Sequence, residues 1–434
     1  MIGKILKKKA RRIFPAAVEG KFFHRIAVAW KEFSTAADRQ VGFWSRCILS
    51  RTTKTVNNRI LFMTFQHDYA CNPSYICDAL LKREDGLELY WAVDDGKRKN
   101  LPADPRIIPV KLNTYDYFAA AASAKVIVIN SLLGDKFYPF PVRKDQIVLE
   151  TWHGSLGIKR FDPAHYNTNL SWPEAAKKTG KRTTACISNS VFEEDVFTET
   201  FWAGKPMLRL GHARNDVFFP EFDYRRAELK RAFIEKYELE EDVRFVLYAP
   251  TFRDSHNFEV YDLDAERTVS AFTERFGGQW KLLVRYHYND VKNEAKKNKV
   301  KSPDVIDVTK YPDIQQLLSF ADAGITDYSS WIYDFVMSRR PGFIYARDAE
   351  LYNNERGFYF TLEESPFPVA HDNDEMEAAV LSFDETVYRG RVECFLEEKG
   401  ASDDGRSSER IAEYVAALTK GGPVVPHGIA GRNL

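Results

Sequence analysis

Short apolar runs alternate with helix-like segments along most of the chain. The first series of runs occupies residues 59–64, 87–93, 106–109, 125–130 and 146–151. The second occupies residues 244–249, 280–285, 305–307, 323–326 and 342–345. Strands separated by helical patterns of about 10–15 residues predict parallel sheets with helices on both faces. The pattern therefore predicts an α/β fold in which two doubly wound, Rossmann-like domains face each other across a cleft.

The order of the segments also predicts the division of the chain. The charged stretch between the two series has the composition of a helix and would act as a hinge. The predicted divisions are a basic helical arm (1–59), a first Rossmann-like domain (60–223), a hinge helix (224–241), a second Rossmann-like domain (242–375), C-terminal helices (376–420) and a flexible tail (421–434).

The composition is that of a folded protein. Hydrophobic residues make up 44% and charged residues 29% of 434, which excludes an intrinsically disordered chain. Lys+Arg and Asp+Glu are both 62, so no net charge indicates a nucleic-acid partner. Five scattered cysteines without a CxxC pair argue against disulfides and a zinc site. No carboxylates have metal-binding spacing either, so we expect neither an essential metal nor a cofactor.

The first 60 residues are strongly basic, with 14 Lys and Arg against three Asp and Glu. Residues 1–12 place six basic side chains beside Ile2, Ile5 and Leu6 without one acid. Residues 1–31 therefore predict basic amphipathic helices that bind an anionic membrane surface. The alternative is a solvated helix packed on its own domain. No signal peptide and no apolar stretch of 18 residues is found, so we expect a peripheral protein at the cytoplasmic face of the cell membrane.

Two histidines stand where predicted strands end. His153, in the tetrapeptide WHGS, follows the run 146–151, and His287 follows the run 280–285. Open α/β sheets bind their ligands beyond the carboxyl ends of the strands. A histidine at such a place can serve as general base or charge stabiliser, although a single histidine is more often structural. Two of them in facing domains support each other as candidate catalytic residues.

Hydroxyls and arginines gather at other predicted strand ends. Ser329 and Ser330 open a predicted helix, whose exposed N–H groups and dipole suit a phosphate. The alternative there is an N-cap formed by Asp327 or Ser329. Arg253 and Arg214 also have structural alternatives, an ion pair with a neighbouring acid and an ordinary turn. The candidate phosphate-binding residues are Ser329, Ser330, Asp327, Arg214, Thr251 and Arg253.

Several nucleotide and hydrolase signatures are absent from the sequence. There is no GxGxxG fingerprint, no GxxxxGK[ST] loop and no GxSxG elbow. Dehydrogenases, P-loop NTPases and α/β-hydrolases are therefore disfavoured.

Nine short segments occur in a fixed order between about residues 60 and 360: FMTFQHDYACNPSYICDAL, YWAVDD, AKVIVINS, ETWHGS, ISNSVFEEDVF, GHARND, LYAPTFRD, LLVRYHYND and ITDYSSWIYDF. Together they resemble the CDP-glycerol glycerophosphotransferases of teichoic acid synthesis. The resemblance implies a GT-B-like pair of Rossmann domains and CDP-glycerol as donor. It implies transfer of glycerol phosphate to a hydroxyl of a lipid-linked or polymeric acceptor, with release of CMP. It also implies peripheral attachment to the inner face of the membrane.

The resemblance assigns roles to particular residues. The histidine of the WHG motif, here His153, is the general base of such enzymes, and the later histidine, here His287, is placed at the donor phosphate. Ser329 and Ser330 would bind the pyrophosphate. The remaining carried-over positions are the turn-forming Asp327, the donor-binding Arg214, Thr251 and Arg253, and the acceptor-side Gly154 and Ser155.

The chain departs from the family pattern at two places. The Pro-Leu-Lys that usually follows WHGT is replaced by Leu-Gly-Ile-Lys after WHGS. The usual Leu-His-Pro of the second domain is replaced by Tyr286, His287 and Tyr288. Both histidines are kept, so these changes do not argue against catalysis. They leave open the identity of the acceptor and of the donor polyol.

Other functions fit the same architecture. A transferase for CDP-ribitol or another CDP-polyol differs only in the donor. A GT-B nucleotide-sugar glycosyltransferase would form a glycosidic product without transferred phosphorus. A membrane-bound scaffold without catalysis is disfavoured because both histidines and both serines are present. An oligomer is compatible with the sequence, which does not decide the oligomeric state.

Overall fold

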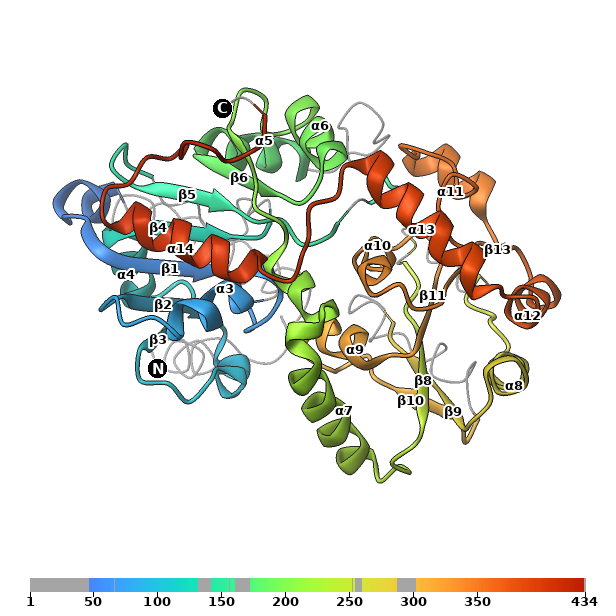
Figure 1. Cartoon of the computed structure of the whole chain (residues 1–434). Helices are drawn as coiled ribbons and strands as arrows, with labels where there is room; N and C mark the ends of the chain where they lie inside the picture. Colours follow the sequence, from blue (N-terminus) through green and yellow to red (C-terminus); the bar gives the residue numbers. More distant parts are fainter. Residues whose placement is uncertain are drawn as a thin grey trace, which may run out of the picture.

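The computed structural model describes residues 47–65, 67–131, 142–155, 157–160, 172–251, 253, 260–286 and 302–432, with the backbone alone described at 172–175 and 356. His287 and the basic arm as far as residue 46 lie outside the described residues. Two parallel sheets lie side by side and form the centres of two domains (Figure 1). The α/β fold class with two doubly wound domains is confirmed.

Seven parallel strands form the sheet of the first domain, in the order β3-β2-β1-β4-β5-β6-β7. The strands are β1 (Val56–Met63), β2 (Glu88–Val93), β3 (Ile107–Lys111), β4 (Ala124–Ile129), β5 (Ile147–Glu150), β6 (Ala185–Ser188) and β7 (Met207–Arg209). The helices between them are α3 (Cys71–Leu81), α4 (Tyr115–Ser123), α5 (Trp172–Arg182) and α6 (Val191–Glu199). The buried parts of the central strands, such as Ile60–Met63 of β1, are apolar because helices cover both faces of a parallel sheet.

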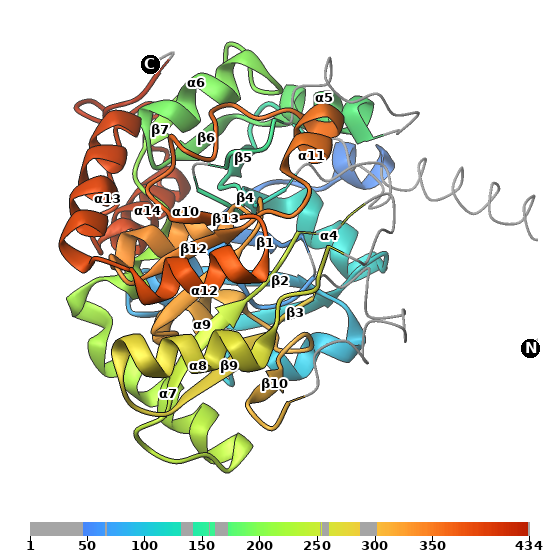
Figure 2. The same ribbon diagram turned by 90° about the vertical axis from the view of Figure 1, so that its right-hand side faces the viewer.

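Six parallel strands form the second sheet, in the order β10-β9-β8-β11-β12-β13. The strands are β8 (Arg244–Tyr248), β9 (Trp280–Val284), β10 (Val305–Asp307), β11 (Ala323–Thr326), β12 (Gly342–Tyr345) and β13 (Val369–Ala370). The helices of this domain are α8 (Ala265–Phe276), α9 (Ile314–Phe320), α10 (Trp331–Phe335), α11 (Ala349–Arg356), α12 (Asn373–Leu381) and α13 (Glu385–Lys399). Figure 2 shows α8 and α12 lying over this sheet.

Side-chain caps explain where several helices begin. The Thr114 hydroxyl accepts from the Tyr117 N–H at the start of α4, and the Ser190 hydroxyl accepts from the Glu193 N–H at the start of α6. Each cap satisfies one of the N–H groups that a first helical turn leaves without a partner. At the C-terminal end of α13, Gly400 takes a left-handed conformation that ends the helix.

The chain crosses between the domains twice. It leaves the first domain through α7 (Asp223–Tyr237), and after α13 it returns through α14 (Ser407–Thr419), which packs against α3 (Figure 1). The carboxylate of Asp216, in the short helix η4 (Ala213–Phe218), accepts from the N–H groups of Ser407 (2.9 Å) and Ser408 (2.7 Å). This buried carboxylate fixes the start of α14 to the domain junction.

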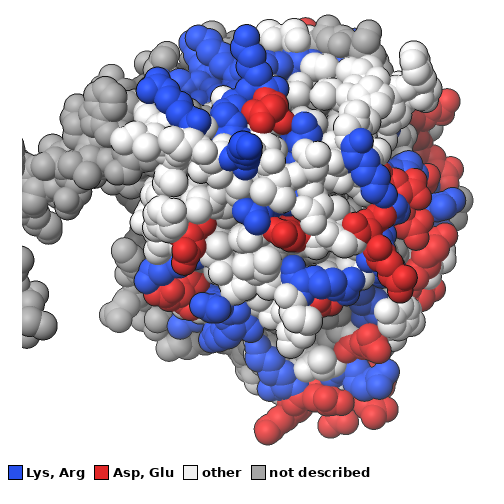
Figure 3. All heavy atoms as spheres, turned by 90° about the vertical axis from the view of Figure 1, so that its left-hand side faces the viewer, with Lys and Arg blue, Asp and Glu red and all other residues white. Residues whose placement is uncertain are grey.

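Charged side chains are unevenly spread over the outer face of the first domain. Figure 3 shows Lys and Arg gathered at its upper left, where Figures 1 and 2 place α5, and mainly acidic side chains at its lower and right edges. Exposed basic residues of α5 include Lys177, Lys178 and Lys181. A balanced net charge therefore conceals local basic and acidic regions.

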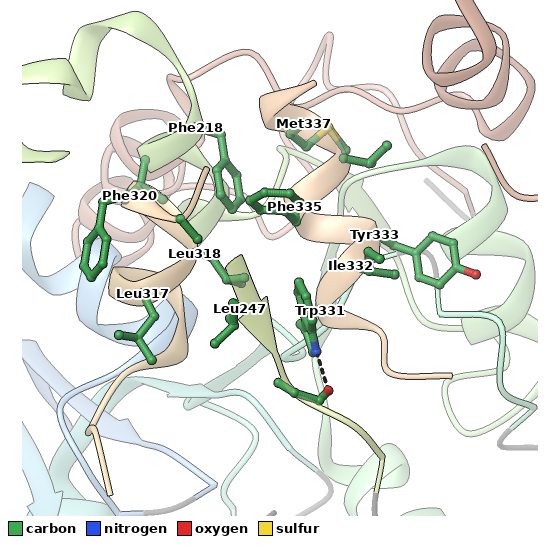
Figure 4. Close-up of a cluster of buried hydrophobic side chains, with 14 of the residues drawn as sticks. Phe218, Leu247, Leu317, Leu318, Phe320, Trp331, Ile332, Tyr333, Phe335 and Met337 are labelled. Atoms are coloured by element: carbon green, nitrogen blue, oxygen red, sulfur yellow. Dashed lines mark hydrogen bonds between the residues drawn. The ribbon is translucent and has the colours of Figure 1, made fainter. Parts of the chain in front are cut away.

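A hydrophobic cluster joins the two domains beneath the strand ends (Figure 4). Phe218 comes from η4 and packs edge-on against Phe335 of α10, with ring centroids 6.3 Å apart. The indole of Trp331 lies in the same cluster and donates to the carbonyl oxygen of Ala249 at 2.8 Å. A Cβ at Gly324 would lie 2.9 Å from the Trp331 ring, so only glycine allows this approach of helix and strand.

Two details differ from the expectations. Strands β6, β7 and β13 were not expected; β7 and β13 lie at the edges of their sheets. The segment 421–434 was expected to be a flexible tail, yet residues of it pair with β7: Met207 donates to the Arg432 carbonyl and Arg209 to the Ala430 carbonyl, both at 2.9 Å. The free edge of β7 supplies backbone groups that a sequence pattern does not reveal.

In the part of the chain that the structure describes, no helix combines the length and the apolar composition needed to cross a bilayer.

Candidate active site

The carboxyl ends of strands from both domains meet at one place. His153 and Gly154 follow β5 of the first sheet, and the turn 327–330 follows β11 of the second. A Cβ on Gly154 would lie only 2.6 Å from the Ser330 hydroxyl oxygen. Glycine at this position therefore lets the two domains bring the predicted base and the predicted phosphate-binding serines together.

The hydrogen bond of His153 determines which nitrogen can act as a base. Its Nδ1 lies 2.6 Å from the carbonyl oxygen of Asn130, just after β4. A carbonyl can only accept, so Nδ1 carries the proton and Nε2 of the neutral imidazole keeps its lone pair. The ring lies between Trp152, with centroids 4.2 Å apart, and the partly exposed Phe65, stacked at 5.7 Å.

The surroundings of His153 favour its neutral form. Burial lowers the pKa of this imidazole to about 4; the Asn130 carbonyl opposes the shift, and the nearby charge of Arg214 adds to it. At neutral pH the side chain is therefore an unprotonated imidazole whose Nε2 carries a lone pair. That is the form a general base requires.

Asp327 organises the turn after β11. Its Oδ1 accepts from the backbone N–H of Thr251 at 2.8 Å and from that of Tyr328 at 2.6 Å. Its Oδ2 lies 2.8 Å from the guanidinium of Arg253. The buried carboxylate thus ties the turn that holds the serines to the segment after β8.

Arg253 lies beneath this turn rather than on its surface. Its guanidinium forms two hydrogen bonds to Asp348, at 2.8 and 2.9 Å, and one to the Thr251 carbonyl at 2.8 Å. It also packs against the rings of Tyr328 and Tyr352 at 4.9 and 4.8 Å. Only 4% of this side chain is exposed. Arg253 therefore stabilises the turn from inside the protein, next to the buried Thr251.

The serines of the turn are half-buried at the junction. Ser330 is the N-cap residue of α10, but its side chain makes no capping hydrogen bond. The helix has only five residues, so its dipole is small and the hydroxyls themselves are the main feature of this site. The alternative predicted Asp327 or Ser329 as the N-cap; the structure places Ser330 at that position instead.

Arg214 is buried in the contact between the domains. Its guanidinium pairs with the carboxylate of Asp334 in α10 and lies 3.3 Å from the Cys71 sulfur, while its backbone N–H donates to Asn72 at 3.1 Å. Asp334 is completely buried and Arg214 is 5% exposed. The arginine predicted to bind the donor thus forms a buried ion pair across the junction, close enough to influence His153.

Ser155 belongs to the same buried network. Its N–H and its hydroxyl both donate to Asp334, and its oxygen accepts from Asn189 at 3.0 Å and Asn215 at 2.9 Å. His212 Nδ1 lies 3.1 Å away. The Ser155 side chain, predicted to lie on the acceptor side, is fully buried and links the domains.

The sequence motifs missed three residues that shape this site. Asn130 fixes the tautomer of His153, Asn72 holds the backbone of the WHG segment, and Asp334 joins the domains. Asn130 is the polar residue that ends the run 125–130, which is a usable signal. The roles of Asn72 and Asp334 depend on contacts with distant segments and have no local signal.

The described residues contain no group of three or more His, Cys, Asp or Glu side chains arranged to hold a metal ion.

Comparison with known proteins identifies relatives. A family model described as CDP-glycerol:poly(glycerophosphate) glycerophosphotransferase matches residues 46–417. The chain is 27% identical over 382 residues to a teichoic acid poly(glycerol phosphate) polymerase of Bacillus subtilis, an alignment that covers 82% of this chain and 48% of the relative. It is 26% identical over 384 residues to a teichoic acid glycerol-phosphate transferase of Staphylococcus aureus, with 84% and 94% covered.

A solved structure shares the fold. The wall teichoic acid polymerase TagF superposes with a TM-score of 0.73 and 22% identity, over 93% of this chain and 99% of that one. The chain spans about half the length of the Bacillus subtilis relative but nearly all of the Staphylococcus aureus one.

Proposed function

This chain belongs to the CDP-glycerol:poly(glycerophosphate) glycerophosphotransferase family, and on that premise we propose that it transfers glycerol phosphate from CDP-glycerol to an acceptor hydroxyl, with release of CMP. The acceptor would be lipid-linked or polymeric, in the synthesis of teichoic acid or a related cell-surface polymer. The names of two relatives, a glycerol-phosphate polymerase and a glycerol-phosphate transferase, support this class of substrate.

One observation carries the proposal. His153, a neutral histidine whose Nδ1 is bound to the Asn130 carbonyl, follows a strand end of one domain. The next residue, Gly154, lies against the Ser330 hydroxyl at a strand end of the other domain. Phosphoryl transfer needs a base for the attacking hydroxyl and hydrogen-bond donors for the phosphate oxygens. His153 supplies the first, and Ser329 and Ser330 supply the second.

The proposed step is a displacement at the β-phosphorus of CDP-glycerol. The acceptor oxygen attacks this phosphorus while His153 Nε2 takes its proton. The bond between the β-phosphorus and the bridging oxygen breaks, and CMP leaves with the electron pair. Ser329 and Ser330 donate hydrogen bonds to the pyrophosphate oxygens. His287, which lies outside the described residues, is proposed to stabilise charge on the departing CMP.

The activity is tested by incubating the full chain with CDP-glycerol or CDP-ribitol, with and without bacterial membranes as acceptor, and measuring CMP. We expect membrane-dependent CMP release with CDP-glycerol. Faster CMP release with CDP-ribitol would identify CDP-ribitol, not CDP-glycerol, as the donor. No CMP release from either donor would contradict the proposed function and favour a glycosyltransferase, whose product lacks transferred phosphorus.

Replacing Ser329 and Ser330 together by alanine should weaken donor binding. A hydrogen bond to a charged group contributes about 1.5–3 kcal/mol, so even one lost bond raises the dissociation constant of CDP-glycerol about tenfold or more. Titration calorimetry measures this constant directly. Ser382→Ala, an exposed serine at the end of α12, is the control. Unchanged donor affinity in the double variant would remove the serines from the donor site.

We also propose peripheral attachment to the cell membrane through the basic arm of residues 1–31. Six basic side chains within residues 1–12, at about 1 kcal/mol each near an anionic surface, give reversible attachment that weakens with salt. Removing residues 1–12 should therefore reduce cosedimentation with anionic liposomes at physiological salt and leave activity on a soluble acceptor nearly unchanged. Undiminished liposome binding would exclude the arm as anchor, and the basic residues of α5 would be tested next.

A further inference from the structure

The residue before His153 has an unusual backbone conformation. Trp152 has φ of +52°, in the left-handed region that aromatic side chains rarely occupy. Such a conformation is strained and persists only where surrounding contacts impose it. Because Trp152 joins β5 to His153, its φ and ψ set the direction in which the imidazole leaves the sheet.

Two buried side chains hold the polar groups on either side of this residue. The Trp152 N–H donates to Glu150 Oε1 at 2.9 Å. The Trp152 carbonyl accepts from Asn72 Nδ2 at 3.1 Å, and the same nitrogen donates to the Thr151 carbonyl at 2.7 Å. Both backbone groups of Trp152 are therefore bound by side chains.

Asn72 has little freedom to move. It lies in the first turn of α3, is 1% exposed, and its Oδ1 accepts from the backbone N–H of Arg214 at 3.1 Å. One amide thus connects α3, the WHG segment and the short helix η4. A displacement of the Trp152 turn would break hydrogen bonds that no water can replace in a buried place.

Glu150 acts as a neutral acceptor. It is completely buried, and burial raises its pKa to about 8 although the N–H groups of Trp152 and Thr151 oppose the shift. The side chain is then mostly protonated at neutral pH. A glutamine, which has nearly the same shape, would offer the same carbonyl oxygen to Trp152.

We propose that Asn72 and Glu150 are positioning residues that hold Trp152 in its left-handed conformation and so direct Nε2 of His153 toward the acceptor hydroxyl. The proposal rests on the proposed function, because it takes His153 as the base. A misplacement of about 1 Å can lower a rate about 10²-fold, so rigid support of this turn is of direct value for catalysis.

The chain contains a matched control for Asn72. Gln146 is also a buried amide; its Nε2 donates to two carbonyls, those of Ala121 (2.9 Å) and Ala124 (2.8 Å), and its Oε1 accepts from the Arg143 N–H. It lies just before β5, at the end opposite to His153. Loss of the Gln146 hydrogen bonds should lower folding stability as loss of the Asn72 hydrogen bonds does. It should leave the Trp152 turn unchanged.

The test compares Asn72→Leu, Glu150→Leu, Glu150→Gln and Gln146→Leu in the full chain. We expect Asn72→Leu and Glu150→Leu to lower kcat for CMP release about tenfold or more, with KM for CDP-glycerol within about twofold. Glu150→Gln should retain kcat within about twofold. Gln146→Leu should lower the melting temperature without lowering kcat. Equal losses of kcat in Asn72→Leu and Gln146→Leu would overturn the proposal.

A second measurement does not depend on activity. In protein labelled with ¹⁵N-histidine, the imidazole signals of His153, identified by their loss in His153→Ala, report the Nδ1–H tautomer. Asn72→Leu should disturb these signals, and Gln146→Leu should leave them unchanged. Undisturbed signals in Asn72→Leu would overturn the proposal. If Asn72→Leu disturbs these signals but the unsubstituted chain releases no CMP, the positioning role is kept and the proposed function is rejected.

Discussion

His153→Ala is expected to lower CMP release about 10²–10⁴-fold, the contribution of a well-placed general base. The substitution removes the only atom, Nε2, that this histidine offers to an acceptor hydroxyl, since Nδ1 is bound to the Asn130 carbonyl. CDP-glycerol binding should change little, because the proposed donor contacts come from Ser329 and Ser330. Initial rates of CMP release and calorimetric titration of the donor measure the two effects separately.

His371 is the matched control for this experiment. It is exposed, and its Nδ1 also lies near a carbonyl oxygen, that of Ala346 at 3.0 Å. His371→Ala should therefore retain the rate. If His153→Ala stays within a few-fold of the original rate, another residue is the base, and His287 becomes the candidate.

Asp334→Ala is expected to destabilise the protein by about 3–5 kcal/mol, as found when one partner of a buried ion pair is removed. The variant leaves the Arg214 guanidinium buried without its carboxylate and deprives the Ser155 N–H of its acceptor. Since Arg214 and Asp334 come from different domains, the junction between them should open first. Urea unfolding followed by circular dichroism measures the loss.

Glu385→Ala is the control for the ion pair. Glu385 pairs with Arg389 on the exposed side of α13 at 2.7 Å, and exposed pairs contribute only about 0–1 kcal/mol. If Asp334→Ala yields no folded protein, Asp334→Asn, which keeps the shape and loses the charge, takes its place. A loss of stability no larger than that of Glu385→Ala would contradict the role assigned to the pair.

Much of the fold could be predicted from local pattern. The expected runs match ten strands within a few residues, and the run 305–307 coincides with β10. The pattern works because buried parallel strands need continuous apolar residues, whereas amphipathic helices repeat their apolar residues with the helical period. It fails for β6, β7 and β13 and for the tail, whose pairing with β7 depends on an edge that is distant in sequence.

The candidate site was predictable in part. Strand ends and the family resemblance pointed to His153, Ser329 and Ser330, and the structure brings His153 and the serine turn together. The same reasoning proposed donor contacts for Arg214 and Arg253, and the structure shows both paired with carboxylates of this chain. A charged side chain has the same appearance in a sequence whether it meets phosphate or an aspartate of the same chain.

The sequence by itself determined the α/β architecture, the family and the residue types at the strand ends, because these depend on local spacing and on short motifs. Only the tertiary structure decided which nitrogen of His153 is free, and that Ser155 faces Asp334, 179 positions away. The physical reason is that a buried polar group must find its partner in space. Which partner it finds depends on how the two sheets pack, not on the residues beside it.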